Sequence, residues 1–345
     1  MRNETPLRII AEIGVNHNGE VDLAKRLVDE AQKAGATAVK FQTFDVDSII
    51  VKNAPKATYH IETTGTDDHG SWYQLLQSQA LTKAEFQCLF EYSRELGLEF
   101  ISTPYDIPSA NLLRDIGCST VKIASTDVNN FPLLRAVCEF SSEVILSTGM
   151  SDLSEVLGAM SVLSEKPVDK ITLLQCTSNY PVPLDQSNIA VLNGYRSIFG
   201  ERVSVGFSDH VLSDIPSIMA VALGARTFEK HITLDKTMLG PDHRSSLTPA
   251  EFSEYTDALL QAYAALGDGI KRVMPCEREN KSKLQKFVVA NRRVAVGETI
   301  DQEAFGLKRN GGIGLSAFYW DQVEGKRVCR VIESGDSLGW KDIES

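Results

Sequence analysis

This 345-residue chain lacks several features that would place it in a specialised class. Its six cysteines include no CxxC pair, so we predict reduced thiols of a cytoplasmic protein and not a disulfide framework. No apolar run reaches the ~20 residues of a membrane helix, and the N-terminal stretch MRNETPLRIIAEIG has no signal-peptide core. The 35 basic and 46 acidic residues give a net charge of −11, which argues against non-specific binding to nucleic acids or anionic membranes. We therefore expect a cytoplasmic globular protein with neither of these partners.

A glycine-rich GxGxxG turn is also missing, which disfavours a doubly wound open sheet as the alternative fold. The chain instead contains eight short apolar, β-rich runs separated by helical patterns, at residues 8–14, 38–43, 99–104, 120–125, 143–149, 171–177, 203–209 and 226–232. These runs are too apolar to alternate cleanly, as expected for parallel strands that are buried on both faces. Eight strand–helix units within ~250 residues predict an α/β fold of the (β/α)8 TIM-barrel class.

The domain organisation follows from the end of this pattern. We predict a barrel over residues 1–266, a charged linker over 267–286 and a small β-rich module over 287–345. Within the barrel, Thr82 with Glu85 and Thr248 with Glu251 have the spacing of helix capping boxes. The second unit carries a long insertion, residues 44–81, which we expect to form a lid or an interface.

Polar residues gather where the predicted strands end, which is where barrel enzymes place their active sites. Burying so many charged groups costs free energy unless they are paired or functional. The residues at these ends are Glu12, Lys40, Thr103, Lys122, Ser125, Thr148, Thr177, Ser208, Asp209, His210, Glu229, Lys230 and His231. The amines of Lys40 and Lys122, together with the hydroxyls among them, predict a cradle for a phosphate and a carboxylate.

His210 and His231 end the seventh and eighth strands, which are neighbours in a barrel. Two imidazoles without a cysteine, in a site completed by water and substrate oxygens, suit Mn²⁺ or Mg²⁺ at least as well as zinc. Simpler interpretations exist for single residues: a strand-end histidine can be structural, and a buried lysine can form an ion pair or a Schiff base. On spacing alone Asp242, in GPDH, is a turn residue.

The barrel segment resembles the sialic acid synthases (N-acetylneuraminate synthases) and the related legionaminic and pseudaminic acid synthases. The shared motifs occur in the same order: IIAEIGVNHNG, VKFQTF, ISTPYD, VKIAS, LSTGM, CTSNYP, GFSDH and EKHITLDKTMLGPDH. In the tail, VVANRRVAVGETI and LKRNGGIG resemble the antifreeze-like (SAF) domain that follows the barrel in this family. The resemblance implies a metal-dependent condensation of phosphoenolpyruvate with an N-acetylmannosamine-type sugar and water, which gives a nine-carbon 2-keto acid and phosphate.

The resemblance also implies a role for each matching residue. Phosphoenolpyruvate would be held by Lys40, Thr103, Lys122, Ser125 and Ser208. The divalent metal would be ligated by His210 and His231, and the sugar contacted by Tyr180 and Asp242. Arg309, in LKRNGG, would reach from the SAF domain of one subunit into the barrel of the other, which implies a homodimer. Glu12 would be the carboxylate near the developing charge; we expect it to position or deprotonate water, with help from Asp127.

The sequence departs from the family pattern mainly on the sugar side. Asp127 stands where several relatives have glutamate, and Asn310 replaces the proline common after the tail arginine. In the insertion, Thr66 or Asp67 falls where some members have an asparagine that contacts the sugar. The identity of the sugar therefore stays open between N-acetylmannosamine, its 6-phosphate and a 2,4-diacetamido-trideoxy hexose. A Schiff-base aldolase and a non-catalytic carbohydrate-binding protein are the rival functions.

Overall fold

The computed structural model describes residues 7–56, 61, 63–64, 71–166 and 168–344. The chain divides into two compact units, Met1–Asp268 and Gly269–Ser345. The segment predicted as a linker, 267–286, belongs largely to the second unit and contains the short helix α12 (Arg278–Leu284). Thr66 and Asp67, the candidate sugar contacts of the insertion, lie outside the described residues.

The first unit is a closed barrel of eight parallel strands in sequence order, which confirms the predicted TIM-barrel class. Its strands are β1 (Arg8–Gly14), β2 (Ala38–Thr43), β3 (Glu99–Pro104), β4 (Thr120–Ile123), β5 (Glu143–Ser147), β6 (Lys170–Cys176), β7 (Val203–Asp209) and β8 (Thr227–His231). Pairing of β1 with β8 closes the ring and sets Glu12 opposite His231. The barrel therefore brings the ends of its first and last strands together.

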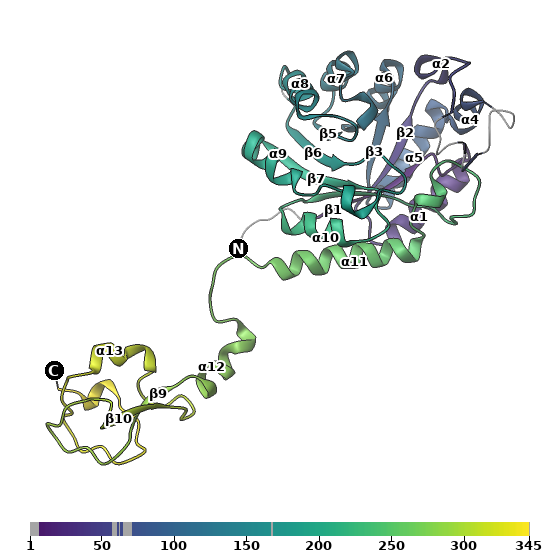
Figure 1. The fold of residues 1–345 in the computed structure, drawn as a ribbon. Coiled ribbons are helices and arrows are strands. Elements are labelled where there is room, and N and C mark those ends of the chain that lie inside the picture. Colours follow the sequence, from purple (N-terminus) through teal and green to yellow (C-terminus); the bar gives the residue numbers. More distant parts are fainter. Residues whose placement is uncertain (1–6, 57–60, 62, 65–70, 167, 345) are drawn as a thin grey trace. The chain divides into compact units, whose positions relative to one another are not determined.

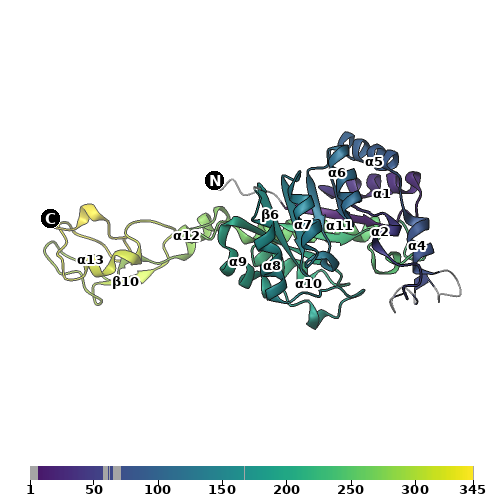
Figure 2. The same cartoon turned by 90° about the horizontal axis from the view of Figure 1, so that it is seen from above.

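Helices surround the ring of strands on the outside (Figures 1 and 2). They are α1 (Val21–Lys33), α5 (Lys83–Glu95), α6 (Ile107–Ile116), α7 (Phe131–Cys138), α8 (Leu153–Leu163), α9 (Val191–Phe199), α10 (Ile215–Ala222) and α11 (Pro249–Leu266). Both predicted capping boxes are present, because Thr82 and Thr248 accept the backbone N–H of Glu85 and Glu251. The insertion adds α2 (Val46–Ile49) and α4 (Trp72–Gln79), and Ser71 caps α4 with a further box.

The two ends of the barrel have different chemistry. At the N-terminal end of the strands, the Arg8 guanidinium donates two hydrogen bonds of 2.7 Å to the Glu143 carboxylate. Glu99 lies 3.2 Å from Arg8, and Lys170 lies 3.1 Å from Glu143. Above this layer the interior is filled by small and branched apolar side chains: Ile10, Ala38, Ile101, Ile145 and Leu174. The interior is therefore closed below, and the functional side chains stand at the opposite rim.

The second unit has its own apolar core, which includes Val288, Ile300 and Phe305. Its two strands, β9 (Phe287–Ala290) and β10 (Phe305–Lys308), pair antiparallel, and the short helix α13 (Trp320–Val323) follows. This agrees with the β-rich module expected from the sequence. In the described part of the chain, no helix has the length and apolar character needed to cross a bilayer.

Candidate active site

The carboxyl ends of the strands open into one cavity of about 950 Å³. Of the twelve predicted site residues, eleven line it: Glu12, Lys40, Thr103, Lys122, Ser125, Asp127, Tyr180, Ser208, His210, His231 and Asp242. They come from β1, β2, β3, β4, β7 and β8 and from the loops beyond β4, β6, β7 and β8. Residues separated by up to 230 positions in the sequence therefore line the same cavity. Helices α2 and α4 of the insertion contribute to its outer part.

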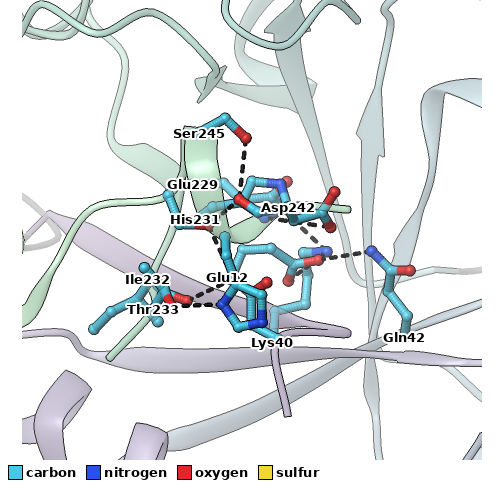
Figure 3. A network of polar contacts seen from close by, with 12 residues as sticks. Glu12, Lys40, Gln42, Glu229, His231, Ile232, Thr233, Asp242 and Ser245 are labelled. Atoms are coloured by element: carbon cyan, nitrogen blue, oxygen red, sulfur yellow. Dashed lines mark hydrogen bonds and ion pairs between the residues drawn. The ribbon is translucent and has the colours of Figure 1, made fainter. Parts of the chain in front are cut away.

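A compact cluster of two lysines and two glutamates forms the floor of this cavity: Lys40, Lys122, Glu12 and Glu229. Figure 3 shows three of them, namely Glu12, Lys40 and Glu229. Lys40 Nζ lies 2.8 Å from Glu12 Oε2 and 3.8 Å from Glu229 Oε2, and it donates to Thr103 Oγ1 at 3.2 Å. Lys122 Nζ lies 3.6 Å from Glu229 Oε1. All four charged side chains are almost completely buried, and their formal charges balance. Such a cluster is stable without a ligand and still presents two ammonium groups to an anion.

The two carboxylates of the cluster differ in their surroundings. Burial raises the pKa of Glu12 above its ordinary value, and the neighbouring Glu229 adds to this, while Lys40 acts against it. Burial also disfavours the charged form of Glu229, but Lys122 and Lys40 outweigh it and lower the pKa of that carboxyl to about 2. Ser208 supports the anion by donating to Glu229 Oε1 at 2.9 Å. Glu229 is thus a fixed negative charge between two lysines, whereas Glu12 is the carboxyl that holds a proton more readily.

The two predicted metal ligands face one another. The ring centroids of His210 and His231 are 5.5 Å apart, and the ring of Tyr180 lies 4.3 Å from His210 and 5.9 Å from His231. His210 Nδ1 lies 3.0 Å from the carbonyl oxygen of Thr177, which leaves its Nε2 for another partner. Burial lowers the pKa of His231 well below its ordinary value, and the neighbouring His210 acts in the same direction.

These residues fit a divalent cation with an incomplete set of protein ligands. His231 Nδ1 is buried and makes no hydrogen bond within the described part of the chain; Asp242 Oδ2 lies 3.8 Å away. No group of three or more His, Cys, Asp or Glu side chains poised for a metal occurs among the described residues. Two imidazoles therefore need oxygen donors from water or a substrate, which is the coordination that Mn²⁺ and Mg²⁺ accept.

Hydroxyl groups shape the wall beside Lys122. Ser125 Oγ accepts the backbone N–H of Gly149 at 2.9 Å, on the loop that follows β5. A Cβ atom on Gly149 would lie 2.2 Å from Ser178 Oγ and 2.9 Å from Ser125 Oγ, so only glycine permits this approach. The result is a concave surface of backbone and hydroxyl groups of the kind that receives phosphate oxygens.

The loop between β8 and α11 is held by the loop between β1 and α1. Asn16 Nδ2 donates to the carbonyl oxygen of Ile232 at 2.8 Å and to Ser246 Oγ at 2.9 Å. Ser246 Oγ and Ser245 Oγ in turn donate to the carbonyl oxygen of Asp242, the latter at 3.1 Å (Figure 3). Asp242 therefore has a fixed backbone, and it lines the cavity.

Asp127 also lines the cavity. It lies in the 3-10 turn Ser125–Asp127, which follows β4. Its carboxylate accepts hydrogen bonds from Asn130 Nδ2 at 2.8 Å and from Thr126 Oγ1 at 2.9 Å. Burial raises the pKa of Asp127, and these two donors act against it. Asp127 is therefore held in place by hydrogen bonds within its own turn.

Sequence reasoning assigned no role to two residues that the structure places in the cavity. Glu229 contacts both lysines, and Gln42 Nε2 donates to Glu12 Oε1 at 3.3 Å. A signal for each was present, because side chains two positions apart on a strand share a face. Glu229 precedes His231 by two residues and Gln42 follows Lys40 by two.

Arg309 is the one predicted site residue outside this cavity. It belongs to the second compact unit and follows β10, where its Nε donates to the carbonyl oxygen of Leu284 at 3.0 Å. Asn310, which replaces a proline of the family pattern, accepts the backbone N–H groups of Gly312 and Ile313. The asparagine thus orders the turn by hydrogen bonds where a proline would order it by its ring.

Comparison with known proteins identifies the family of the chain. The model of the NeuB family matches residues 27–271, and that of the SAF domain matches residues 286–344. The chain is 38% identical to the N,N'-diacetyllegionaminic acid synthase of Campylobacter jejuni, over 92% of this chain and 94% of that protein. It is 31% identical to the N-acetylneuraminate-9-phosphate synthase of Mus musculus, over 99% of this chain and 93% of that protein.

A solved structure supports the same assignment. The N-acetylneuraminic acid synthetase of Leptospira borgpetersenii, in complex with citrate, has a TM-score of 0.68 and 32% identity to this chain. The match covers 82% of this chain and 96% of that one. The family model spans most of the barrel, and the SAF model spans the module after it. The chain therefore belongs to the NeuB family of sialic acid synthase-type enzymes, with a C-terminal SAF domain.

Proposed function

We propose that this protein condenses phosphoenolpyruvate with an acetamido hexose and water to give a nine-carbon 2-keto sugar acid and phosphate. The observation that carries the proposal is the single cavity in which two buried lysines, two glutamates and a facing histidine pair meet. The names of the relatives, which are nonulosonate synthases, support the same reaction.

Phosphoenolpyruvate is the anionic substrate that suits the cluster on the floor. Its carboxylate and phosphate together need several cationic or hydroxyl donors, and Lys40, Lys122, Thr103, Ser125 and Ser208 supply them from adjoining strands. The ion pair of Lys122 with Glu229, at 3.6 Å, is longer than that of Lys40 with Glu12, at 2.8 Å, so the ammonium group of Lys122 is the freer of the two to turn toward a phosphate. We assign these five residues to phosphoenolpyruvate.

Carbon–carbon bond formation joins C3 of phosphoenolpyruvate to the aldehyde carbon of the open-chain sugar. Residues His210 and His231 would hold Mn²⁺ or Mg²⁺, with the remaining ligands from water and substrate. When bound, such a cation supplies Lewis-acid polarisation of a carbonyl group. Tyr180, which packs against both imidazoles, and Asp242 stand at the sugar side of the cavity.

Water then adds to C2, which carries positive charge after C3 has attacked. Glu12 is the residue that we assign to position this water and take its proton, because its carboxyl group faces the cavity and is held by Lys40 and Gln42. The tetrahedral intermediate expels phosphate by cleavage of the C2–O bond, so the phosphate keeps its bridging oxygen. Asp127 lines the same cavity, and we assign it a role in support of Glu12.

Among the three candidate sugars we propose a 2,4-diacetamido-trideoxy hexose. The insertion lines the outer part of the cavity with apolar side chains, namely Ile49, Ile50, Val51, Ala54, Leu75 and Leu76. A methyl group at C6 and two acetamido methyl groups suit such a wall better than the free hydroxyls of N-acetylmannosamine or a 6-phosphate. The higher identity to the legionaminic acid synthase than to the 9-phosphate synthase points the same way.

We further propose a homodimer in which Arg309 of one subunit completes the cavity of the other. Supporting this, the segment after His210 exposes Leu212, Ile215 and Met219, which are 64%, 54% and 51% exposed in the single chain. The turn that carries Arg309 exposes Ile313. Mixing the inactive variants Arg309→Ala and Lys122→Met should restore about a quarter of the activity, since half of the dimers are mixed and each has one intact site. No restoration would refute action between subunits.

Phosphate release tests the reaction itself. The protein is incubated with phosphoenolpyruvate and Mn²⁺, and with each of the three candidate sugars in turn. We expect phosphate only when a sugar is present, with the highest kcat/KM for the 2,4-diacetamido-trideoxy hexose. Borohydride trapping of a lysine adduct with pyruvate, in place of phosphate release, would establish the Schiff-base aldolase instead.

A further inference from the structure

A second buried polar network lies behind the cavity, on the outer face of β7 and β8. Asp209 and Lys230 are partners in the strand register, as are Ser208 and Glu229 one rung earlier. Because side chains alternate along a strand, the residues on either side of Asp209 and Lys230 point into the cavity while this pair points outward. The proposed function uses the inner residues of these two strands and leaves the outer pair without a role.

The outer pair is completely enclosed. Asp209 is 1% exposed and Lys230 is 3% exposed, and Lys230 Nζ lies 3.0 Å from Asp209 Oδ2. Ser217, on α10, donates to Asp209 Oδ2 at 2.8 Å and lies 2.9 Å from the hydroxyl group of Tyr255, on α11. The ammonium group of Lys230 also lies 5.5 Å from the centre of the Tyr255 ring. Every group of this network thus has a polar or aromatic partner.

The network holds both polar groups of one backbone residue, Val211. Asp209 Oδ1 accepts the backbone N–H of Val211 at 2.8 Å, and Lys230 Nζ donates to its carbonyl oxygen. Val211 directly follows His210, whose own carbonyl oxygen accepts the backbone N–H of Val182 at 2.9 Å. The chain on the far side of His210 is therefore fixed at both its donor and its acceptor by one ion pair.

Stability alone does not account for an ion pair at this place. The neighbouring outward residues, Phe207 and Phe228, are apolar and belong to the main core. Replacing a buried ion pair by well-packed apolar residues is often neutral or stabilising, because both charges must otherwise be stripped of water. This buried pair lies at the ends of the strands, and its remaining hydrogen bonds go to Val211, the residue after His210. These are the features of residues that orient a neighbouring ligand.

We propose that Asp209 and Lys230 are positioning residues that fix His210 through Val211, and thereby set the separation of the His210–His231 pair. This inference rests on the proposed function in one respect, the assignment of these two histidines to the divalent cation. We call the two contacts of Asp209 and Lys230 with the Val211 backbone the clamp. Without the clamp both imidazoles are still present, but the position of His210 is no longer fixed. The affinity for the cation therefore falls although no ligand has been removed.

The test measures cation affinity directly, without substrate or turnover. Free Mn²⁺ is followed by electron paramagnetic resonance during titration of the full chain. In the variants Lys230→Met and Asp209→Asn we expect the dissociation constant for Mn²⁺ to rise about 10- to 100-fold, as for other residues that orient metal-bound histidines. The graded variant Ser217→Ala, which removes one donor to Asp209 and leaves the clamp on Val211, should show a rise of about threefold or less.

The matched control breaks a buried ion pair at the opposite end of the same barrel. Arg8→Met removes both guanidinium hydrogen bonds to Glu143. We expect a fall in melting temperature comparable to that of Lys230→Met, while the Mn²⁺ affinity stays within about twofold of that of the unmodified chain. If Lys230→Met and Asp209→Asn do not fold, Lys230→Arg takes their place. It keeps the positive charge but not the hydrogen bond of the ammonium group to the carbonyl oxygen of Val211, so it should bind Mn²⁺ more weakly than the unmodified chain. Unchanged affinity in these variants, or equal weakening in Arg8→Met, would overturn the inference.

Histidine ring resonances in nuclear magnetic resonance spectra give a readout that needs no metal. We expect the His210 ring signals to shift in Lys230→Met and to stay in place in Arg8→Met. If the unmodified chain binds no Mn²⁺, the metal assignment of the proposed function fails, and the His210 signals alone decide the positioning role. Unshifted signals would refute it.

Discussion

Replacing Glu12 with glutamine removes a negative charge from the floor of the cavity while it keeps the shape of the side chain. Glu12 is 1% exposed, and its closest charged partner is Lys40 at 2.8 Å. The question is whether Glu12→Gln would unfold the barrel or only stop the reaction. The answer depends on how well the remaining charges compensate the buried ammonium group of Lys40.

Coulomb's law gives the scale of this compensation. With an effective permittivity of about 20, the attraction is about 6 kcal/mol for Lys40–Glu12 at 2.8 Å and about 4 kcal/mol for Lys40–Glu229 at 3.8 Å. Glu229 therefore still neutralises Lys40, and the repulsion between the two glutamates disappears. We expect the free energy of unfolding to change by less than about 2 kcal/mol, which the fold can tolerate.

The effect of Glu12→Gln on kcat should be much larger than its effect on stability. A glutamine side chain can hold water but cannot take its proton, and general-base contributions are about 10²- to 10⁴-fold. We expect kcat for phosphate release in Glu12→Gln to fall about 10²- to 10³-fold, while the dissociation constant for phosphoenolpyruvate stays within about fivefold. Glu143→Gln, a buried change at the other end of the barrel, is the control and should keep its kcat. A Glu12→Gln variant with more than about a third of the normal kcat would refute the reasoning.

Three further predictions concern stability and the metal. Arg8→Met should lower the free energy of unfolding by about 2–4 kcal/mol in urea denaturation, because it strips Glu143 of its bidentate partner and leaves Lys170 and the Thr172 hydroxyl group to hold the buried carboxylate; a loss below about 0.5 kcal/mol would contradict this. Burial lowers the pKa of His17 to about 4, whereas the pKa in the unfolded chain is near 6.5, so the free energy of unfolding decreases as the pH falls from about 6.5 toward 4. In His17→Asn this decrease should be smaller by about 3 kcal/mol. An unchanged dependence of the unfolding free energy on pH would count against it. EDTA should abolish phosphate release, Mn²⁺ should restore it, and His210→Ala should abolish it even at saturating Mn²⁺, whereas full activity in that variant would remove His210 from the metal site.

The barrel could be predicted from the sequence because its strands are continuous apolar runs of the right length and number. The apolar pattern predicts strand ends less closely where a polar residue follows the strand within two positions. The fourth run was predicted to extend to residue 125, but β4 ends at Ile123, and Ser125 begins a 3-10 turn. That turn lets the Ser125 hydroxyl group reach the backbone of Gly149, a contact that no local pattern indicates.

The sequence predicts which residues line the site but not which of them contact one another. Motif order and strand ends located the residues that line the cavity, whereas the partner of each depends on the strand register. Glu229 was left without a role because a crowded Glu-Lys-His stretch does not show which residues face inward. Once the register sets Ser208 opposite Glu229 and Asp209 opposite Lys230, the same stretch separates into an inner functional row and an outer clamp.

The measurement that tests the central claim most directly is phosphorus nuclear magnetic resonance of the complete reaction in ¹⁸O-labelled water. The protein, Mn²⁺, phosphoenolpyruvate and the 2,4-diacetamido-trideoxy hexose are incubated together, with N-acetylmannosamine in a parallel sample. The account predicts phosphate that appears only when a sugar is present and that carries no ¹⁸O shift, because the C2–O bond breaks. Phosphate that carries the label, or no phosphate with any of the candidate sugars, would contradict it.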